Sequence, residues 1–390
     1  MNTVLITGAT GFLGSHLAVR LLRDGQGTVW LARGAGRRTA AERVRRILDW
    51  FGVDPGLRSG LRVVEAEISR PELGLARSEF EALAADVDEI VHCASDTSFP
   101  EKKRPQVELA NVEGTRNVLE LAAAGGRCGV FHLLSTAYAA GRRTGVCPEE
   151  LTRPAAFTNV YEETKCRAEW LAADACRAAG IRLSIYRPSI VYGDSRTGRS
   201  LLFNALYFPV RTFAFLKDVF EADIRERGGR RAAAVGVGLG DDGRLRLPVR
   251  LEVGNGGWLD LVPVDFFVDA FAALRDEAGE GGIYQIVSGR PTSLAEIVDY
   301  GQRFLGIRGV EVCAERAFGG PPPNDLEALF DRYLESYLPY LRDERTFSRE
   351  RARPVLEKRG ISCPEMDYGI FARCLKYAVE CGWGARVLPA

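Results

Sequence analysis

Hydrophobic and polar positions follow two alternating periods through the first half of the chain. Short runs rich in β-branched residues predict strands, and the segments between them, with apolar residues every three or four positions, predict helices. The predicted strands are Val4–Thr7, Thr28–Ala32, Leu61–Glu65, Glu89–Cys93, Val130–Ser135 and Leu183–Arg187. The predicted helices are Phe12–Leu22, Ala40–Trp50, Arg77–Ala85, Asn111–Ala124 and Val160–Ala179. This alternation indicates an α/β fold with a Rossmann-type, doubly wound parallel sheet covered on both faces.

The alternation breaks after Gly193. Residues 195–257 hold an aromatic-rich segment, a basic stretch and a glycine-rich part, whereas residues 262–275 again predict a helix and residues 283–287 a strand. We therefore predict a sheet domain made of residues 1–195 and 258–290. A smaller lobe, discontinuous in sequence, would comprise residues 196–257 and the helical tail, 291–390.

Composition and charge narrow the class of protein. A chain of 390 residues exceeds what one hydrophobic core usually supports, which agrees with two lobes. Basic and acidic residues number 52 each, so no net charge directs the chain to nucleic acid. The most apolar stretch, Ser200–Val210, is too short for a transmembrane segment, and the first strand starts too early for a signal peptide. We expect a soluble, cytoplasmic protein.

The nine cysteines are scattered along the chain, and no two of them form a CxxC pair. The three histidines, His16, His92 and His132, stand apart from any cysteine cluster. This distribution predicts neither a disulfide framework nor a metal site, and it agrees with a reducing compartment.

A glycine-rich turn joins the first strand to the first helix. Its sequence is TGATGFLG, residues 7–14. Three glycines at this junction permit a tight turn, a close backbone approach to a pyrophosphate, and close packing of the helix on the strand. The predicted dinucleotide-binding residues of the turn are Gly8, Thr10, Gly11, Phe12, Leu13 and Gly14.

The end of the second strand distinguishes NAD from NADP. An acidic residue there binds the ribose 2′-hydroxyl of NAD, whereas arginine accommodates the 2′-phosphate of NADP. The sequence has Arg33 at this position, followed by Arg37 and Arg38, and no acidic residue before Glu42. We therefore predict NADPH as the cofactor, with Arg33 as the main phosphate ligand and Arg37 beside it.

The third and fourth strands end in further candidate residues. Glu67 and Ile68 follow the third strand and are placed to address the adenine, and Ala94 follows the fourth, where a small residue lets backbone lie against the cofactor. His92 is interpreted as a structural residue. Cys93 is interpreted as a packed thiol, because nothing basic flanks it to lower its pKa.

Tyr161 and Lys165 lie four residues apart, on one face of a predicted helix. A phenol with a pKa near 10 exchanges protons poorly at neutral pH, and a nearby ammonium is expected to lower that pKa. Ser135 and Thr136 end the fifth strand, where a hydroxyl can polarise a carbonyl oxygen. Thr164 is expected to lie off the face that carries Tyr161 and Lys165.

Together, TGATGFLG, STA (residues 135–137) and YEETK (residues 161–165) resemble the extended short-chain dehydrogenase/reductase family. The resemblance implies a catalytic triad of Thr136, Tyr161 and Lys165, and it favours Thr136 over Ser135. It also implies that Lys165 contacts the nicotinamide ribose and that the strand and loop around Ser189 lie beside the nicotinamide. Asn111 matches the asparagine at the family's helix start.

Within this family, residues 69–75, 87–92, 135–141 and 187–198 resemble the branch that reduces acyl thioesters, namely terminal reductase domains of peptide synthetases and fatty acyl-CoA reductases. The GDSRTG loop, residues 193–198, is the most specific of these; Glu67 departs from the branch, which has Asp there. The resemblance implies reduction of a thioester to an aldehyde, with reduction onward to the alcohol left open. A free-standing enzyme is expected to meet its acyl group on coenzyme A or on a separate carrier protein.

Two alternatives stay open at this point. An alcohol/ketone dehydrogenase or a nucleotide-sugar epimerase or dehydratase would share the triad, and a non-catalytic NADP sensor would share the fold. The aromatic segment Leu201–Phe220 fits an acyl channel and a packed lid equally well.

Overall fold

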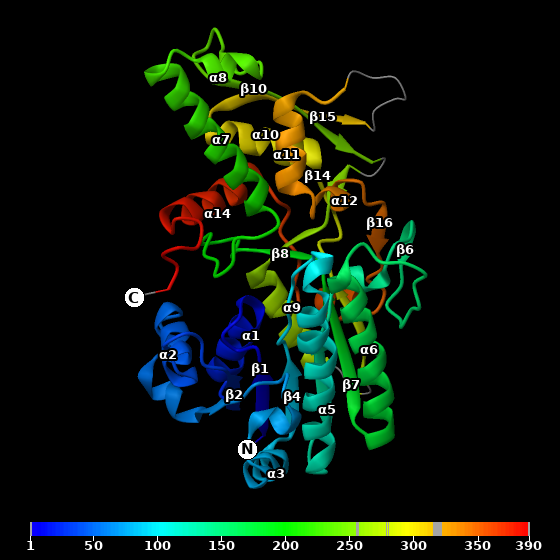
Figure 1. Ribbon diagram of the computed structural model, residues 1–390. Coiled ribbons are helices and arrows are strands. Elements are labelled where there is room, and N and C mark those ends of the chain that lie inside the picture. The colour runs from blue at the N-terminus through cyan, green and yellow to red at the C-terminus, as the bar shows by residue number, and fades with distance from the viewer. Residues whose placement is uncertain (1, 255–256, 278, 280, 315–321, 389–390) are drawn as a thin grey trace.

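The large sheet contains seven strands in the order β13-β7-β5-β4-β1-β2-β3 (Figure 1). A computed structural model describes residues 2–254, 257–277, 279, 281–314 and 322–388. The strands are β1 (Thr3–Thr7), β2 (Gly27–Ala32), β3 (Leu61–Glu65), β4 (Glu89–His92), β5 (Val130–Leu134), β7 (Arg182–Pro188) and β13 (Gly282–Ile286). Every pairing between neighbours is parallel. The predicted doubly wound parallel sheet is therefore confirmed.

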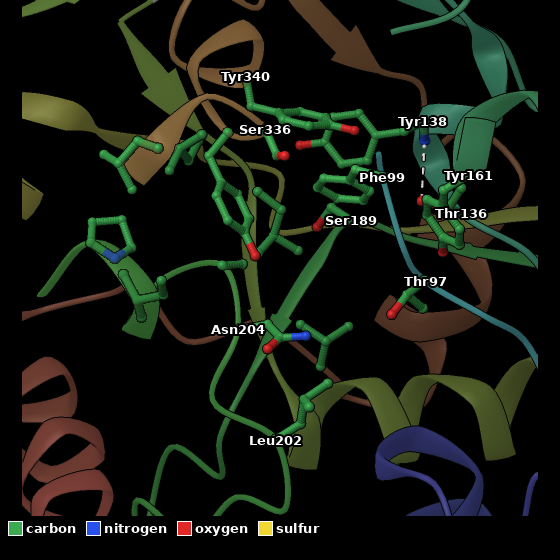
Figure 2. Close-up of a pocket in the computed structure, with 18 of the residues that line it drawn as sticks. Thr97, Phe99, Thr136, Tyr138, Tyr161, Ser189, Leu202, Asn204, Ser336 and Tyr340 are labelled. Atoms are coloured by element: carbon green, nitrogen blue, oxygen red, sulfur yellow. Dashed lines mark hydrogen bonds between the residues drawn. The ribbon is translucent and has the colours of Figure 1, made fainter. Parts of the chain in front are cut away.

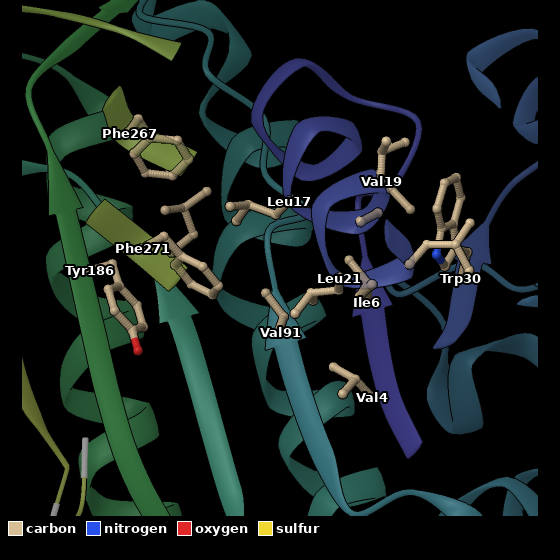
Figure 3. Packing of buried hydrophobic residues seen from close by; sticks show 14 of the residues in the cluster. Val4, Ile6, Leu17, Val19, Leu21, Trp30, Val91, Tyr186, Phe267 and Phe271 are labelled. Atoms are coloured by element: carbon tan, nitrogen blue, oxygen red, sulfur yellow. The ribbon is translucent and has the colours of Figure 1, made fainter. Parts of the chain in front are cut away.

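Helices cover both faces of this sheet, and each face has its own core. The first face carries α1 (Phe12–Arg23), α2 (Ala40–Trp50) and α9 (Val264–Glu277). The second carries α3 (Arg77–Asp86), α5 (Gly114–Ala124) and α6 (Val160–Ala179). Figure 3 shows the first core, in which Leu17 and Leu21 of α1 and Phe267 and Phe271 of α9 lie over the strands.

The two cores explain the near-continuous apolar runs of the strands. Val4, Leu5 and Ile6 of β1 are fully buried. Successive side chains of a strand point to opposite faces, so Val4 and Ile6 join the first core and Leu5 joins the second. A parallel strand that is buried on both faces favours apolar residues at most positions, and β1 follows this pattern.

A second, three-stranded sheet lies beyond the carboxyl ends of the large sheet (Figure 1). It pairs β10 (Leu245–Val253) with β15 (Ile307–Ala314) in parallel and with β9 (Gly238–Leu239) antiparallel. Its apolar core also takes residues from α7 (Tyr207–Glu226), α8 (Arg230–Ala234) and α11 (Asp325–Leu334), and α10 (Leu294–Leu305) packs along β15.

Two short parallel strands, β8 (Ile190–Tyr192) and β12 (Leu261–Pro263), link the sheets before α9 and β13 return to the large one. The C-terminal tail packs against both the smaller lobe and the region of the large sheet. Helix α14 (Tyr368–Glu380) packs against α10, whereas α13 (Ala352–Lys358) packs against α9 in the first core. The predicted division places residues 291–390 wholly in the smaller lobe; α13 instead lies with the large sheet, because Ala352 and Leu356 bury their side chains there. The division into two domains stays a prediction.

Among the described residues, none of the helices combines the length and the apolar character needed to cross a membrane.

A buried charge cluster joins α9 to the strands. The Glu89 carboxylate at the start of β4 accepts hydrogen bonds from His132 Nε2 at 2.5 Å and from Arg275 Nε and Nη2 at 2.5 and 2.6 Å. Burial would raise the pKa of Glu89, but these hydrogen bonds outweigh it and lower the pKa to about 2. His132 also accepts a hydrogen bond from the Tyr186 hydroxyl at 3.0 Å, so the Glu89 cluster ties together three strands, β4, β5 and β7, and helix α9.

We expect Glu89→Gln to lower the free energy of unfolding by about 3 kcal/mol at neutral pH, because Arg275 would lose its buried counter-charge. The folded-state pKa of Glu89 lies below the ordinary value of 4.5, so its contribution is present above that value and is lost as the pH falls towards 2. Urea unfolding should therefore show the parent and the variant converging at acidic pH. Glu81→Gln, which alters only an exposed pair with Arg77, is the control; a difference no larger than the control's would contradict the assignment.

Candidate active site

A cavity of about 750 Å³ opens at the carboxyl edge of the large sheet and extends into the smaller lobe. Parallel α/β sheets bind ligands at this edge, because loops from several strands converge there. The wall includes Gly8 after β1, Cys93 after β4, Thr136 after β5 and Ser189 after β7. Figure 2 shows Thr136 and Tyr161 close together at one side of the cavity, and Leu202 and Asn204 on another part of its wall.

The glycine-rich turn has the geometry that the sequence predicts. Gly8 has φ +69°, and a Cβ on it would lie 2.7 Å from the backbone nitrogen of Ala94. A Cβ on Gly14 would lie 2.3 Å from the carbonyl oxygen of Gly8. Helix α1 starts at Phe12 with no side-chain cap at Gly11 and no acidic residue in its first turn. Its first amides are thus open to an anion, and the positive end of the helix dipole is not compensated.

At neutral pH, His92 is uncharged and Cys93 is a protonated thiol. His92 lies between the hydroxyls of Thr7 and Thr115, at 2.8 and 3.0 Å, and burial lowers its pKa to about 3. Burial raises the pKa of Cys93 to about 12, so the thiol keeps its proton. Cys93 lines the cavity, whereas His92 is buried behind it, and both are structural residues as interpreted from the sequence.

The predicted adenosine side of the site lies at the ends of β2 and β3. Arg33 and Arg37 are exposed, and Arg33 Nη1 donates to Glu67 Oε2 at 3.3 Å. Burial raises the pKa of Glu67, but the guanidinium of Arg33 and the hydroxyl of Ser69 lower it overall. The carbonyl oxygen of Ile68 accepts a hydrogen bond from Asn117 Nδ2 at 2.7 Å, which fixes the loop after β3.

The structure brings the three predicted catalytic residues to one wall of the cavity. Thr136 follows β5, and Tyr161 and Lys165 lie in the first two turns of α6. The side chains of Tyr161 and Thr136 lie close together (Figure 2), near enough for Thr136 to lower the pKa of the phenol. Lys165 Nζ donates to the carbonyl oxygen of Leu134, the last residue of β5. Asn159 caps the helix by accepting a hydrogen bond from the amide of Glu162 at 3.1 Å.

The protonation of Tyr161 differs from the expectation. Burial raises the pKa of Tyr161 to about 12, and the hydrogen bond with Thr136 offsets only part of this. Burial also lowers the pKa of Lys165 to about 8, against the opposing charge of Glu169. The ammonium of Lys165 donates to Leu134, and it is not among the groups that shift the pKa of the phenol. Tyr161 therefore holds its proton at neutral pH, which is the form that can donate to an oxygen.

The geometry also separates Ser135 from Thr136. Ser135 Oγ donates to Glu169 Oε1 at 2.5 Å, and Arg187 holds the same carboxylate through two hydrogen bonds of 2.8 and 2.6 Å. The hydroxyl of Ser135 is thus committed to a buried ion pair. Thr136 is the strand-end hydroxyl that faces Tyr161.

Ser189, which is predicted to lie beside the nicotinamide, lines the cavity, but its hydroxyl points elsewhere. Ser189 Oγ donates to Asp260 Oδ1 at 2.6 Å, and Ser288 donates to both oxygens of the same carboxylate. Any contact between Ser189 and a cofactor would therefore use its backbone. Sequence reasoning missed Asp260, which fixes the loops after β7 and β13 from a position far along the chain.

Sequence reasoning also missed an aromatic cluster around Tyr161 (Figure 2). The ring of Phe99 lies 6.0 Å from that of Tyr161 and 5.7 Å from that of Tyr340. Tyr340 packs edge to face on Tyr138, with centroids 5.1 Å apart, and its hydroxyl donates to Glu162 Oε1 at 2.9 Å. These rings come from distant segments, so no local pattern in the sequence could have grouped them.

Comparison with known proteins places this site in a family. Residues 6–271 match the family described as male sterility protein. The chain belongs to the male sterility protein family. This membership confirms the predicted place among extended short-chain dehydrogenases/reductases and the predicted binding of a nicotinamide dinucleotide.

Two curated relatives and one solved structure extend the comparison. A linear gramicidin synthase polypeptide of Brevibacillus parabrevis is 27% identical over 98% of this chain and 7% of its own length. Fatty acyl-CoA reductase 1 of Rattus norvegicus is 27% identical over 77% of this chain and 60% of its own length. The chain thus spans less than two thirds of either relative. The terminal R domain from the myxalamid PKS-NRPS pathway shares the fold, with a TM-score of 0.74 at 24% identity over 98% of this chain and 91% of its own.

In this family member, Asn111 and Thr164 hold the loop after β4 against helix α6, which carries Tyr161 and Lys165. The predicted helix start at Asn111 is instead a π-helical turn, Leu109–Glu113, ahead of α5. Asn111 Nδ2 donates to the Asp96 carbonyl at 2.9 Å and to Thr164 Oγ1 at 3.0 Å, and Asn111 Oδ1 accepts from Ser95. Thr164 is fully buried and is not the uninvolved position that the helical spacing predicts.

We expect Thr164→Ala to lower the free energy of unfolding by about 1–3 kcal/mol, because it leaves one amide hydrogen of Asn111 buried without an acceptor. Chemical denaturation measures this loss. Arg167→Ala, on the exposed face of the same helix, is the matched control and should cost less than about 1 kcal/mol. Equal effects of the two substitutions would show that the Asn111–Thr164 bond contributes nothing to stability.

Proposed function

We propose that this chain reduces acyl thioesters to aldehydes with NADPH. The observation that carries the proposal is one continuous cavity that joins a protonated Tyr161, paired with Thr136, to a long apolar wall in the smaller lobe. The two curated relatives, a linear gramicidin synthase and a fatty acyl-CoA reductase, support the same chemistry. A nucleotide-sugar site would need polar and charged groups to hold a sugar and a diphosphate. The lobe side of this cavity offers mainly leucine, isoleucine, valine and phenylalanine.

The chain's own residues would perform the proton chemistry. The bound nicotinamide would supply a hydride to the carbonyl carbon of the thioester. Tyr161 would donate its proton to the carbonyl oxygen while Thr136 hydrogen-bonds the same atom, which stabilises the developing oxyanion. Loss of the thiol from the resulting hemithioacetal would give the aldehyde, and a second hydride transfer, to the alcohol, stays open. Lys165 would bind the nicotinamide ribose, where its ammonium can exchange Leu134 for the ribose hydroxyls.

The acyl group would arrive on coenzyme A or on a separate carrier protein. All nine cysteines are free, which supports the proposed cytoplasmic location.

We expect NADPH to bind about 10- to 100-fold more tightly than NADH, because a charge-assisted contact to the 2′-phosphate contributes roughly 1.5–3 kcal/mol. Arg33 is exposed at the end of β2 and can leave Glu67 to make that contact. Fluorescence titration of both cofactors measures the preference, and Arg33→Ala should remove most of it. Arg62→Ala, which removes an exposed arginine near the start of β3, at the opposite ends of the strands from Arg33, should leave the preference unchanged. An unaltered preference in Arg33→Ala would refute this assignment.

We expect Tyr161→Phe to lower kcat for thioester reduction about 10²- to 10⁴-fold while NADPH binding stays near that of the parent. Lys165→Ala should damage both turnover and cofactor affinity, because one ammonium serves the ribose and the site's charge. Thr136→Ala should cost less than Tyr161→Phe, since the phenol remains as a donor. The measurement is NADPH consumption with acyl-coenzyme A and acyl-pantetheine substrates.

Tyr333→Phe is the matched control, because Tyr333 is half-exposed on α11 and does not line the cavity. A Tyr161→Phe enzyme that reduces thioesters at the parent rate would refute the catalytic assignment. A parent enzyme that oxidises NADPH with ketones or sugar nucleotides, and with no thioester, would refute the proposed substrate class.

A further inference from the structure

Helix α10 presents an apolar stripe to the cavity. The stripe recurs at helical spacing, and all its members line the cavity: Leu294, Ile297, Val298, Gly301 and Leu305. Of these only Leu294 is fully buried. A capping box of Ser293 and Glu296 fixes the start of the helix, and Gly306 in the left-handed conformation ends it. An amphipathic helix with secure ends whose apolar stripe borders open space has the form of a wall for an apolar ligand.

The backbone conformation does not require a glycine at position 301, within this stripe. Gly301 lies in the interior of α10, where its conformation is helical and any residue would fit. Glycine weakens a helix interior relative to alanine. Close packing does not require it either, because a Cβ built on Gly301 has no heavy atom within 4 Å outside its own helix and chain neighbours. By comparison, a Cβ on Gly198 would lie 2.4 Å from the Arg373 carbonyl oxygen, where glycine is needed for contact.

The space in front of Gly301 is continuous with the reacting groups. Gly301, Tyr161 and Lys165 line the same cavity. The wall there includes Val210 and Phe213 of the α7 region; the Phe213 ring stacks on Phe330 of α11 with centroids 4.4 Å apart. Gln302, the polar neighbour of Gly301, accepts the amide hydrogen of Val310 at 3.0 Å and so belongs to the framework. An occupant that reaches from Tyr161 past Gly301 must be extended and apolar.

We infer that the stripe on α10 holds the acyl chain of the substrate, and that Gly301 determines how long a chain the cavity accepts. This rests on the proposed reduction of acyl thioesters. The thioester carbonyl would lie at Tyr161 and Thr136, and the chain would run along α10 towards the smaller lobe. The missing side chain at position 301 leaves the room through which the distal carbons pass.

The test compares butyryl-, octanoyl-, dodecanoyl- and hexadecanoyl-pantetheine with the parent and with Gly301→Leu. Filling the stripe should lower kcat/KM for the hexadecanoyl substrate by about 10-fold or more and leave the butyryl substrate within about threefold, because each displaced carbon forfeits its apolar contact. Gly301→Ala adds one methyl group, favours the helix, and should shift the profile in the same direction by less. It keeps the test decisive if the leucine variant folds poorly.

Ala295→Leu is the control, because Ala295 is exposed on the same helix and does not line the cavity. Its chain-length profile should match the parent's. An equal fall of kcat/KM for all four substrates in Gly301→Leu, or an unchanged profile in both Gly301 variants, would overturn the inference.

Binding separates this inference from the proposed function. Calorimetric titration of hexadecanoyl- and butyryl-pantetheine into the parent and the Gly301 variants needs no turnover. Chain-length-dependent weakening in the variants would support the acyl site even if no thioester were reduced, in which case only the proposed reaction would fail. Reduction by a parent whose variants bind all chains alike would leave the reaction standing and remove the role of Gly301.

Discussion

Two buried carboxylates, Glu162 and Glu169, hold helix α6 in place, and the position of Tyr161 in the candidate site depends on this helix. Glu162 and Glu169 lie two turns apart, on the helix that carries Tyr161 and Lys165, and both are almost fully buried. A buried carboxylate is tolerated only when paired and hydrogen-bonded, so each dictates its surroundings. Glu169 binds Arg187 of β7 and Ser135 after β5. Glu162 binds Arg345 at 3.3 Å and the hydroxyl of Tyr340. The helix is thus held to the sheet at one point and to the tail at the other.

This arrangement makes the tail part of the candidate active site. Arg345 begins β16 (Arg345–Phe347), which pairs in parallel with β6 (Gly145–Cys147), and its Nη1 donates to the carbonyl of Gly141. The ring of Tyr340 lines the cavity, and the hydroxyl of the same side chain donates to Glu162. A segment that lies far along the sequence from the glycine-rich turn therefore positions the start of α6, and through it the phenol of Tyr161.

The features that the sequence predicts are those with a local cause. Strands buried on both faces leave nearly continuous apolar runs, so the sheet could be predicted from the sequence. The glycine-rich turn at Gly8 could also be predicted, because all of its residues lie in one segment of eight. Tyr161 and Lys165 share a face because of helical spacing alone. The partners of Glu162, Tyr340 and Arg345, lie 178 and 183 residues away, and no local sequence pattern predicts these contacts. Asn111, in the π-helical turn, likewise has its partner Thr164 53 residues further along the chain. The direction of the Tyr161 pKa shift escaped prediction because it is set by burial, which only packing determines.

The apolar lining of the cavity excludes water from Tyr161 and Lys165 and so shifts the pKa values of both side chains. The surroundings that raise the pKa of Tyr161 and lower that of Lys165 are apolar rings and aliphatic side chains, including Phe99 and Tyr340. The same kind of lining continues over α10 and past Phe213. A phenol that keeps its proton can donate it to a carbonyl oxygen, and a mainly apolar wall gains free energy chiefly by burying an apolar group. Under the proposed function, the apolar groups around Tyr161 would serve two tasks. They bury the phenol and so keep it protonated, and they continue into the wall that would hold the acyl chain.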